Sequence, residues 1–243
     1  MSEQRDKNLW IFNAGNSFAG NPKWMFEYII RHHKEIKPVW MCYNADTMNY
    51  VHKLGYEAEL YHSSKGKSVM AKAGVYVVEM CKEVFQPELS GITVLNLWHG
   101  VGCKSIERKV TDGFLQERIA KKYIQNNDIL RNNQLFLVTS EIMEKHFKEQ
   151  CGIDDDKVIR AGYPRCVVND NIQSYDHDIR KKKGLSANTK LAIYCPTYRD
   201  NNGANFMKSA LPDMKRLAEV LHENNILLIS VSYTHLTLPT NSL

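Results

Sequence analysis

The sequence lacks long apolar runs, paired cysteines and low-complexity tracts. No stretch approaches the roughly 18 apolar residues that cross a bilayer, and the chain does not start with the charged and apolar segments of a secretory leader. None of the six cysteines forms a C-x-x-C pair, so we expect reduced thiols in a cytosol. Hydrophobic residues at 43% and charged residues at 24% are typical of a soluble, folded protein.

Several ligand-binding motifs are also missing. The chain has no G-x-G-x-x-G, no phosphate loop of the Walker type and no His/Cys spacing that suits zinc. The formal charge of +5 and the pI near 8.8 fit an anionic partner, although such an excess is common. The basic run at residues 180–183 fits a solvated connection or helix end better than an anion site.

Short β-rich apolar runs alternate with helical patterns along the chain, which predicts an α/β fold with a parallel, doubly wound sheet. Strands are expected at residues 9–13, 39–43, 58–61, 75–79, 93–97, 135–139, 157–161, 191–195 and 226–230. The first helix should be capped by Asn21 and start at Pro22. Further helices are expected at 46–54, after Ser63 or Ser64, and at 113–130, 142–150 and 206–224.

The pattern divides the chain into three parts. Residues 1–161 form a complete Rossmann-like unit, Gly162-Tyr163-Pro164 breaks the pattern as a linker would, and residues 162–230 begin a second unit that is incomplete. Residues 231–243 carry no charged side chain and many hydroxyls. We expect this last stretch to be a non-native tail.

The most informative motif is Trp98-His99-Gly100-Val101-Gly102-Cys103-Lys104, directly after an apolar strand. Ligands of open α/β sheets bind at the carboxyl ends of strands, so His99 is a candidate catalytic base. A free imidazole has a pKa of about 6.5 and can take up a proton near neutral pH. Gly100 permits close backbone approach to a ligand, and Lys104 supplies positive charge for a phosphate.

Three more motifs carry candidate phosphate-binding residues. Arg165 follows the predicted linker, where a guanidinium suits bidentate contact with phosphate, or is simply solvated. Arg199 and Asp200 lie in a loop after a strand and could neutralise and orient a phosphoryl group, or form a plain ion pair. The helix start at Asn21 and Lys23 follows the first strand, as phosphate-binding turns do.

Together these motifs resemble the CDP-glycerol:poly(glycerophosphate) glycerophosphotransferase family, the teichoic acid polymerase and primase type. The resemblance covers about residues 9 to 230 and is carried by Phe18-Ala19-Gly20-Asn21-Pro22-Lys23, Trp98-His99-Gly100 with Lys104, Gly162-Tyr163-Pro164-Arg165 and Pro196-Thr197-Tyr198-Arg199-Asp200. It implies a GT-B architecture, in which residues 1–161 form the acceptor-side domain and residues 162–230 begin a truncated nucleotide-binding domain.

The resemblance also implies the chemistry. His99 would deprotonate the terminal hydroxyl of a lipid-linked polyol-phosphate acceptor, which attacks the β-phosphorus of CDP-glycerol and expels CMP. Lys104, Arg165 and Arg199 would stabilise charge on the phosphoryl oxygens. The family's chemistry is metal-independent, so we predict neither a metal site nor a cofactor; CDP-glycerol is a donor substrate.

Location and completeness follow from the same resemblance. Members act on a lipid-linked acceptor, which implies a cytoplasmic protein attached peripherally to the anionic inner face of the cell membrane, with no nucleic acid partner. The family's second domain continues beyond this point with another histidine and an Asp-Tyr-Ser-Ser-like loop, so we expect a C-terminally truncated fragment. The alternatives are a GT-B nucleotide-sugar glycosyltransferase or epimerase, and a noncatalytic polymer-binding fragment.

Overall fold

The chain forms two compact units, Met1–Val168 and Asn169–Leu243. The structure is a computed structural model that describes residues 5–80, 86–102, 105–113, 115–125, 133–166, 179–195 and 210–230. The predicted tail at residues 231–243 lies outside these ranges. The division falls later than the predicted boundary at residue 161, because Tyr163 packs into the core of the first unit.

The first unit contains a seven-stranded sheet and the helices that connect its strands. The strands are β1 (Asp6–Asn13), β2 (Lys37–Cys42), β3 (Ala58–Leu60), β4 (Ala73–Val78), β5 (Thr93–Asn96), β6 (Gln134–Val138) and β7 (Val158–Arg160). The α-helices are α1 (Gly20–His32), α2 (Ala45–Lys53), α3 (Ser64–Lys72), α4 (Leu115–Gln125) and α5 (Glu141–Cys151). Short 3-10 helices are η1 (Pro87–Leu89), η2 (Glu107–Lys109), η4 (Asp155–Lys157) and η5 (Pro164–Cys166).

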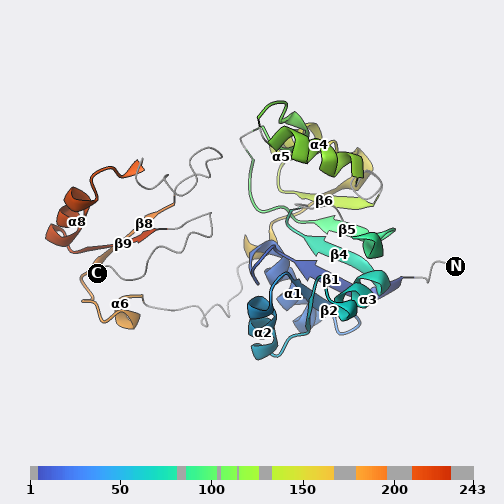
Figure 1. The fold of residues 1–243 in the computed structure, drawn as a ribbon, viewed down its shortest axis with the longest axis horizontal. Helices are drawn as coiled ribbons and strands as arrows, with labels where there is room; N and C mark the ends of the chain where they lie inside the picture. Colours follow the sequence, from blue (N-terminus) through green and yellow to red (C-terminus); the bar gives the residue numbers. More distant parts are fainter. Residues whose placement is uncertain are drawn as a thin grey trace. The chain divides into compact units, whose positions relative to one another are not determined.

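All strand pairs of this sheet are parallel, in the order β3-β2-β1-β4-β5-β6-β7. Figure 1 shows β6, β5, β4, β1 and β2 in this sequence. The order reverses direction between β1 and β4, which makes this pair the topological switch point of a doubly wound sheet. The predicted α/β class with a parallel sheet is confirmed.

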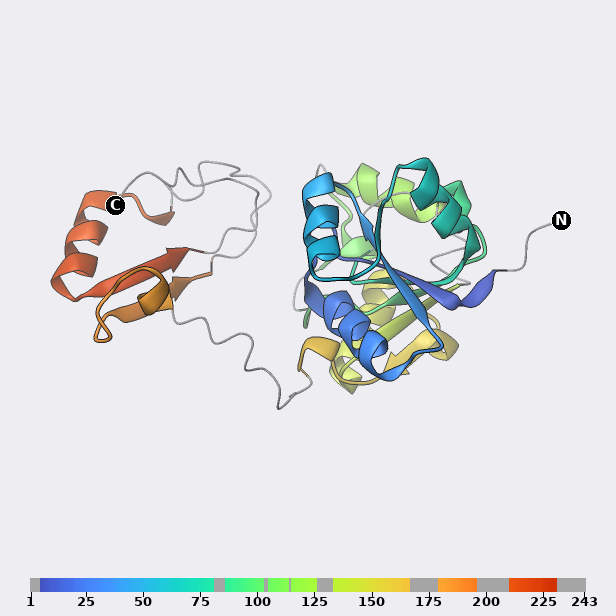
Figure 2. The ribbon, with the colours of Figure 1, turned by 90° about the horizontal axis from the view of Figure 1, so that it is seen from below.

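Helices cover both faces of the sheet (Figure 2). Because side chains alternate along a strand, neighbouring residues of β1 face opposite ways: Phe12 joins the cluster with Phe26 of α1, whereas Ile11 joins the cluster with Met70 of α3. A third cluster places Phe147 of α5 against Trp98, which directly precedes His99. The candidate motif is therefore anchored in the core on its amino-terminal side.

Side-chain caps define several helix starts. Ser63 accepts a hydrogen bond from the backbone amide of Gly66, as predicted for this position. Asn44 and Ser140 cap α2 and α5 in the same way, each satisfying an amide that the helix leaves free. The first helix is the exception, because Ala19 occupies its N-cap position and no side-chain cap is present.

The start of β1 is fastened by Arg5. Its guanidinium donates hydrogen bonds to the backbone oxygens of five residues at the end of α3 and around η1, namely Met70, Ala71, Ala73, Glu88 and Ser90. A cation satisfies helix-terminal carbonyls well, so this one side chain connects the start of β1 to two neighbouring segments.

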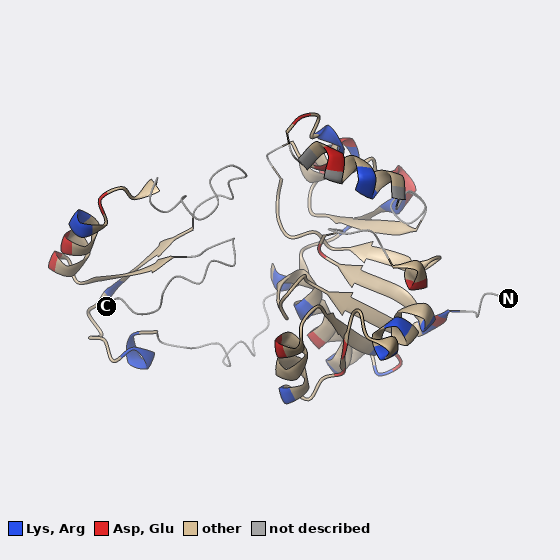
Figure 3. Cartoon of the chain, in the orientation of Figure 1, with Lys and Arg blue, Asp and Glu red and all other residues tan. Residues whose placement is uncertain are grey.

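The second unit contains a parallel pair of strands, β8 (Lys190–Tyr194) and β9 (Ile226–Ser230), joined to α8 (Met214–Glu223). Its basic helix α6 (Ile179–Lys182) carries the run that includes Arg180 (Figure 3). Arg180 donates to the carbonyl oxygen of Thr189 at 2.7 Å, so this member of the run has a structural contact. The predicted βαβ piece is present among the described residues.

Candidate functional site

The candidate site lies at the carboxyl edge of the first unit's sheet. The strands β1, β4 and β5 are neighbours and parallel, so their carboxyl ends share one edge. Asn13, Glu79 and the Trp98-His99 pair occupy or follow these three ends. This edge includes the switch point, where open α/β sheets bind their ligands.

His99 is exposed at this edge and is held on one side. Its ring stacks on that of Trp98, with centroids 4.6 Å apart and 29° between the planes. Its Nδ1 lies 3.4 Å from the backbone oxygen of Glu79. A carbonyl oxygen only accepts hydrogen bonds, so this contact places the hydrogen on Nδ1, and in the neutral ring Nε2 carries the lone pair.

The residue before His99 has an unusual backbone. Trp98 has φ 51°, a left-handed conformation that costs a bulky residue about 1–3 kcal/mol. Its amide donates to Oδ1 of buried Asn96 at 3.0 Å, and Nδ2 of Asn96 donates to Gln134 at 3.1 Å. Trp98 itself is buried. These contacts hold the turn that directs His99 out of the core.

Glu79 joins the site although sequence reasoning missed it. Its carboxylate accepts a hydrogen bond from the backbone amide of Asn21 at 3.2 Å, so an acidic side chain sits at the amino end of α1, where it is favoured electrostatically. Gly20 makes room for it: a Cβ there would lie 2.0 Å from the Glu79 Oε2 atom. The sequence did offer a signal for Glu79, because it is an acidic residue directly after the apolar run of β4. His99 was identified by the same criterion, a polar residue that follows the apolar strand β5.

Asn21 departs from both of its expected roles. The helix begins at Gly20, and Asn21 does not cap it. Its side chain is fully buried: Nδ2 donates to the backbone oxygen of Trp98 at 2.7 Å, and Oδ1 accepts from the amide of Arg165 at 3.3 Å. The structure therefore offers no exposed surface of Asn21 for direct contact with a phosphate.

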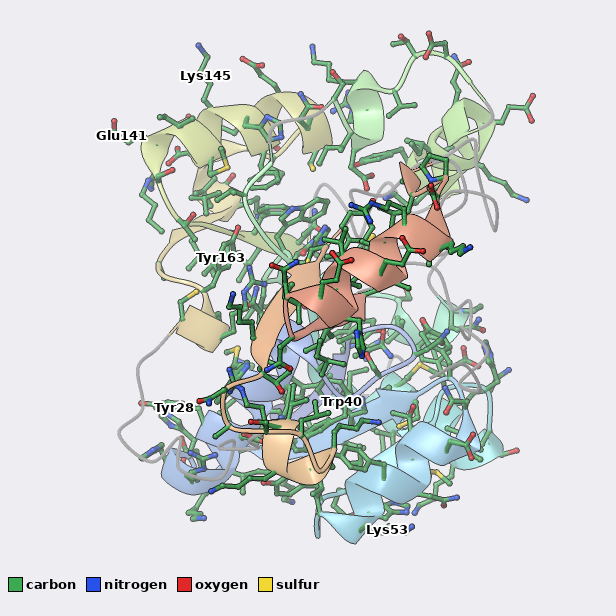
Figure 4. The ribbon with its side chains drawn as sticks, turned by 90° about the vertical axis from the view of Figure 1, so that its left-hand side faces the viewer. Tyr28, Trp40, Lys53, Glu141, Lys145 and Tyr163 are labelled. Carbon is green, nitrogen blue, oxygen red and sulfur yellow. The ribbon has the colours of Figure 1, made fainter. Side chains whose placement is uncertain are left out.

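The Gly162-Tyr163-Pro164-Arg165 segment meets the His99 loop. Arg165 is exposed, and its Nη1 donates to the backbone oxygen of His99 at 2.7 Å. Tyr163, labelled in Figure 4, donates its hydroxyl to the backbone oxygen of Gly100 at 2.8 Å. Burial raises the pKa of the Tyr163 hydroxyl, which keeps it a donor. The segment expected to be a linker instead brings a guanidinium next to His99.

The two glycines after His99 have different surroundings. A Cβ at Gly100 would come no closer than 3.7 Å to Nη2 of Arg165, whereas a Cβ at Gly102 would lie 2.5 Å from Nε2 of His146. A Cβ at Gly102 would therefore have to displace the His146 ring of α5. A Cβ at Gly100 would make only ordinary van der Waals contact with the Arg165 guanidinium among the described residues.

The remaining predicted residues are only partly described. Lys23 lies 3.9 Å from the carboxylate of Glu27 and over the rings of Phe18 and Trp24. Its side chain retains 15% of its exposure. Lys104, Arg199 and Asp200 lie outside the described residues, so their roles stay predictions.

The described residues show neither a metal-ligand cluster nor a membrane-spanning helix. No three or more His, Cys, Asp or Glu side chains gather there as a metal site would require. Within the same ranges, no helix is both long and apolar enough to pass through a membrane. The predictions of no metal and no cofactor stay predictions.

Comparison with known proteins gives consistent matches. A family model described as CDP-Glycerol:Poly(glycerophosphate) glycerophosphotransferase matches residues 1–239. The teichoic acid poly(glycerol phosphate) polymerase of Bacillus subtilis (strain 168) is 25% identical over 201 residues, which cover 77% of this chain and 25% of that protein. The polymerase of the same description from Staphylococcus epidermidis is 21% identical over 227 residues, covering 90% and 31%.

Solved structures show the same fold. A structure of the wall teichoic acid polymerase TagF aligns with a TM-score of 0.71 and 19% identity, over 93% of this chain and 57% of that one. Another, soaked with CDPG, aligns with a TM-score of 0.70 and 18% identity over the same shares. The predicted GT-B-like fold class is confirmed. The chain spans 25% to 57% of the length of these relatives.

Proposed function

Because this chain belongs to the CDP-glycerol:poly(glycerophosphate) glycerophosphotransferase family, we propose that its full-length protein transfers glycerol phosphate from CDP-glycerol. The acceptor is a hydroxyl of a lipid-linked polyol-phosphate chain, and CMP is released. The reaction serves the synthesis of a teichoic-acid-like or capsule-like polymer. The described part of the chain supplies the acceptor-side domain with the base.

The observation that carries this proposal is the geometry of His99. The ring is exposed at the carboxyl edge of the sheet, and the contact of Nδ1 with the Glu79 carbonyl leaves the lone pair of the neutral ring on Nε2. A general base needs this arrangement, because one nitrogen holds the orientation while the other accepts the proton. Typical contributions of such a base are 10²- to 10⁴-fold in rate.

The acceptor hydroxyl gives its proton to Nε2 of His99, and its oxygen forms a bond to the β-phosphorus of CDP-glycerol. The bond between that phosphorus and the bridging oxygen breaks, and CMP leaves with the electron pair. Formation of imidazolium is supported by the Glu79 carbonyl at Nδ1, since a hydrogen bond to the charged form favours it.

Phosphoryl transfer also requires positively charged groups close to the phosphoryl oxygens, whose negative charge they stabilise. Arg165 is exposed next to His99, and its Nη1 donates a hydrogen bond to the His99 carbonyl. We assign it to the phosphoryl oxygens. Lys104 and Arg199 are proposed for the same role, and Asp200 for orienting Arg199, on the strength of their motifs alone. Lys23 is proposed as a weaker, peripheral contribution to the local positive charge.

The acceptor sets the proposed location. A lipid-linked substrate requires the enzyme at a membrane surface, so we propose a cytoplasmic protein attached peripherally to the anionic inner face. Anionic lipids attract basic proteins electrostatically, and the chain carries a formal charge of +5. No nucleic acid takes part in this reaction.

The experiment supplies the purified full-length protein with a lipid-linked glycerol-phosphate acceptor and either CDP-glycerol or a UDP-sugar. We expect CMP release from CDP-glycerol and growth of the acceptor by the mass of glycerol phosphate units. Turnover of the UDP-sugar instead would establish a nucleotide-sugar enzyme. Binding of the acceptor without turnover of either donor would establish a noncatalytic polymer-binding protein.

A further inference from the structure

The amide side chain of Asn21 lies at the junction of three segments of the first unit. It belongs to the first turn of α1, contacts the turn after β5 through Trp98, and contacts η5 through Arg165. Asn21 is fully buried. Asn21 is the second residue of α1, after the N-cap Ala19, so its side chain does not occupy the position at which Asn usually caps a helix.

Both hydrogen bonds of this side chain require a carboxamide. The Trp98 carbonyl needs a donor at 2.7 Å, and the Arg165 amide needs an acceptor. Asparagine supplies one of each from a single rigid group. A carboxylate of the same shape would place an acceptor opposite the Trp98 carbonyl, and an apolar side chain would leave two buried backbone groups without partners.

The two partners of Asn21 are in turn connected through His99. The Trp98 peptide is strained at φ 51° and determines the direction in which the following residue leaves the core. The Arg165 guanidinium donates a hydrogen bond through Nη1 to the His99 carbonyl oxygen at 2.7 Å. Asn21, Trp98, His99 and Arg165 therefore form a closed ring of covalent and hydrogen bonds.

We propose that Asn21 is a positioning residue that fixes the His99 imidazole and the Arg165 guanidinium relative to each other. This inference rests on the proposed function. Because the side chain is buried, Asn21 acts on the substrate only through these two residues. A shift of about 1 Å in a reacting group lowers a rate by up to about 100-fold.

The test compares Asn21→Asp and Asn21→Ala with the matched control Asn44→Asp in the full-length protein. Asn44 caps α2 through its side-chain oxygen, and Asp performs that task equally well, so the control should keep wild-type turnover. For both Asn21 variants we expect kcat for CMP release to fall by about 10- to 100-fold while KM for CDP-glycerol changes less than threefold. Circular dichroism checks that each variant is folded. If Asn21→Asp does not fold, the kinetics of Asn21→Ala decide the question.

A second measurement separates positioning from general damage. In a His99→Ala background, the Asn21→Ala change should lower the residual rate by a smaller factor than it lowers the wild-type rate, because residues that act as a unit are not additive. An equal loss in both backgrounds, or variants of Asn21 with wild-type kcat, would overturn the inference. If the wild-type protein does not turn over CDP-glycerol at all, the proposed function fails instead, and the two failures are thereby distinguished.

Discussion

The replacement of Gly20 by alanine probes the contact between α1 and Glu79. Gly20 has φ +69°, and a Cβ there would lie 2.0 Å from Oε2 and 2.6 Å from Cδ of Glu79. Gly55 has φ +80° with no atom within 4 Å of its Cβ position. The variants Gly20→Ala and Gly55→Ala therefore share the backbone penalty and differ in the clash.

The expected destabilisation follows from these two effects. A left-handed conformation costs a residue with a Cβ about 1–2 kcal/mol, which is the whole effect at Gly55. At Gly20 the carboxylate must also leave, and it loses the hydrogen bond from the Asn21 amide. A hydrogen bond to a charged group contributes about 1.5–3 kcal/mol. The Gly20 variant should thus be less stable than the Gly55 variant by about 2 kcal/mol.

Urea unfolding followed by tryptophan fluorescence measures this difference in the 243-residue chain. The fluorescence reports on the first unit, which ends at residue 168, because it contains all four tryptophans of the chain. These are Trp10, Trp24, Trp40 and Trp98. Equal unfolding free energies for the two variants would refute the placement of Glu79 at the start of α1. A loss at Gly20 that vanishes in a Glu79→Ala background would support it.

Three further predictions concern stability and reactivity. Arg5→Ala removes the hydrogen bonds to five backbone carbonyls and should lower the unfolding free energy in the same urea assay by about 2–3 kcal/mol; no change would contradict its fastening role. Burial raises the pKa of the Cys42 thiol to about 12, so iodoacetamide should label exposed Cys166 well before Cys42, as mass spectrometry can check. Hydrogen bonds from Lys148 and then Arg160 lower the pKa of the Glu144 carboxyl below its ordinary value of 4.5. The ionised carboxylate therefore stabilises the fold above pH 4.5, and this stabilisation is lost as pH falls through the lowered pKa. Across that range the urea midpoint of Glu144→Gln should depend less on pH than the urea midpoint of the wild type.

The apolar pattern of the sequence was sufficient to predict most of the sheet. Each strand of the first unit was expected within a few residues of its observed position, because buried parallel strands are continuous apolar runs. The cap at Ser63 was also predictable, since a serine and the amide it accepts are local in sequence.

Contacts between distant segments were not predictable in this way. Asn21 was expected to cap α1, but Ala19 occupies the N-cap position, and the carboxylate of Glu79, 58 residues away, accepts a hydrogen bond from the backbone amide of Asn21. The Tyr163 segment was expected to be a linker because of its glycine and proline, yet its aromatic ring belongs to the core of the first unit. Local patterns carry no information on such partners, whereas the shared edge of parallel strands did predict the region where they meet.

The most direct test of the account is the rate of CMP release from CDP-glycerol by the full-length protein and its His99→Ala variant, with a lipid-linked glycerol-phosphate acceptor. His32→Ala is the matched control, because His32 is exposed in the last turn of α1 and has no role in the proposed site. Loss of a general base lowers the rate by about 100-fold or more, and this loss is predicted for His99→Ala alone. A His99→Ala rate within threefold of the wild type would contradict the assignment of His99 as the base.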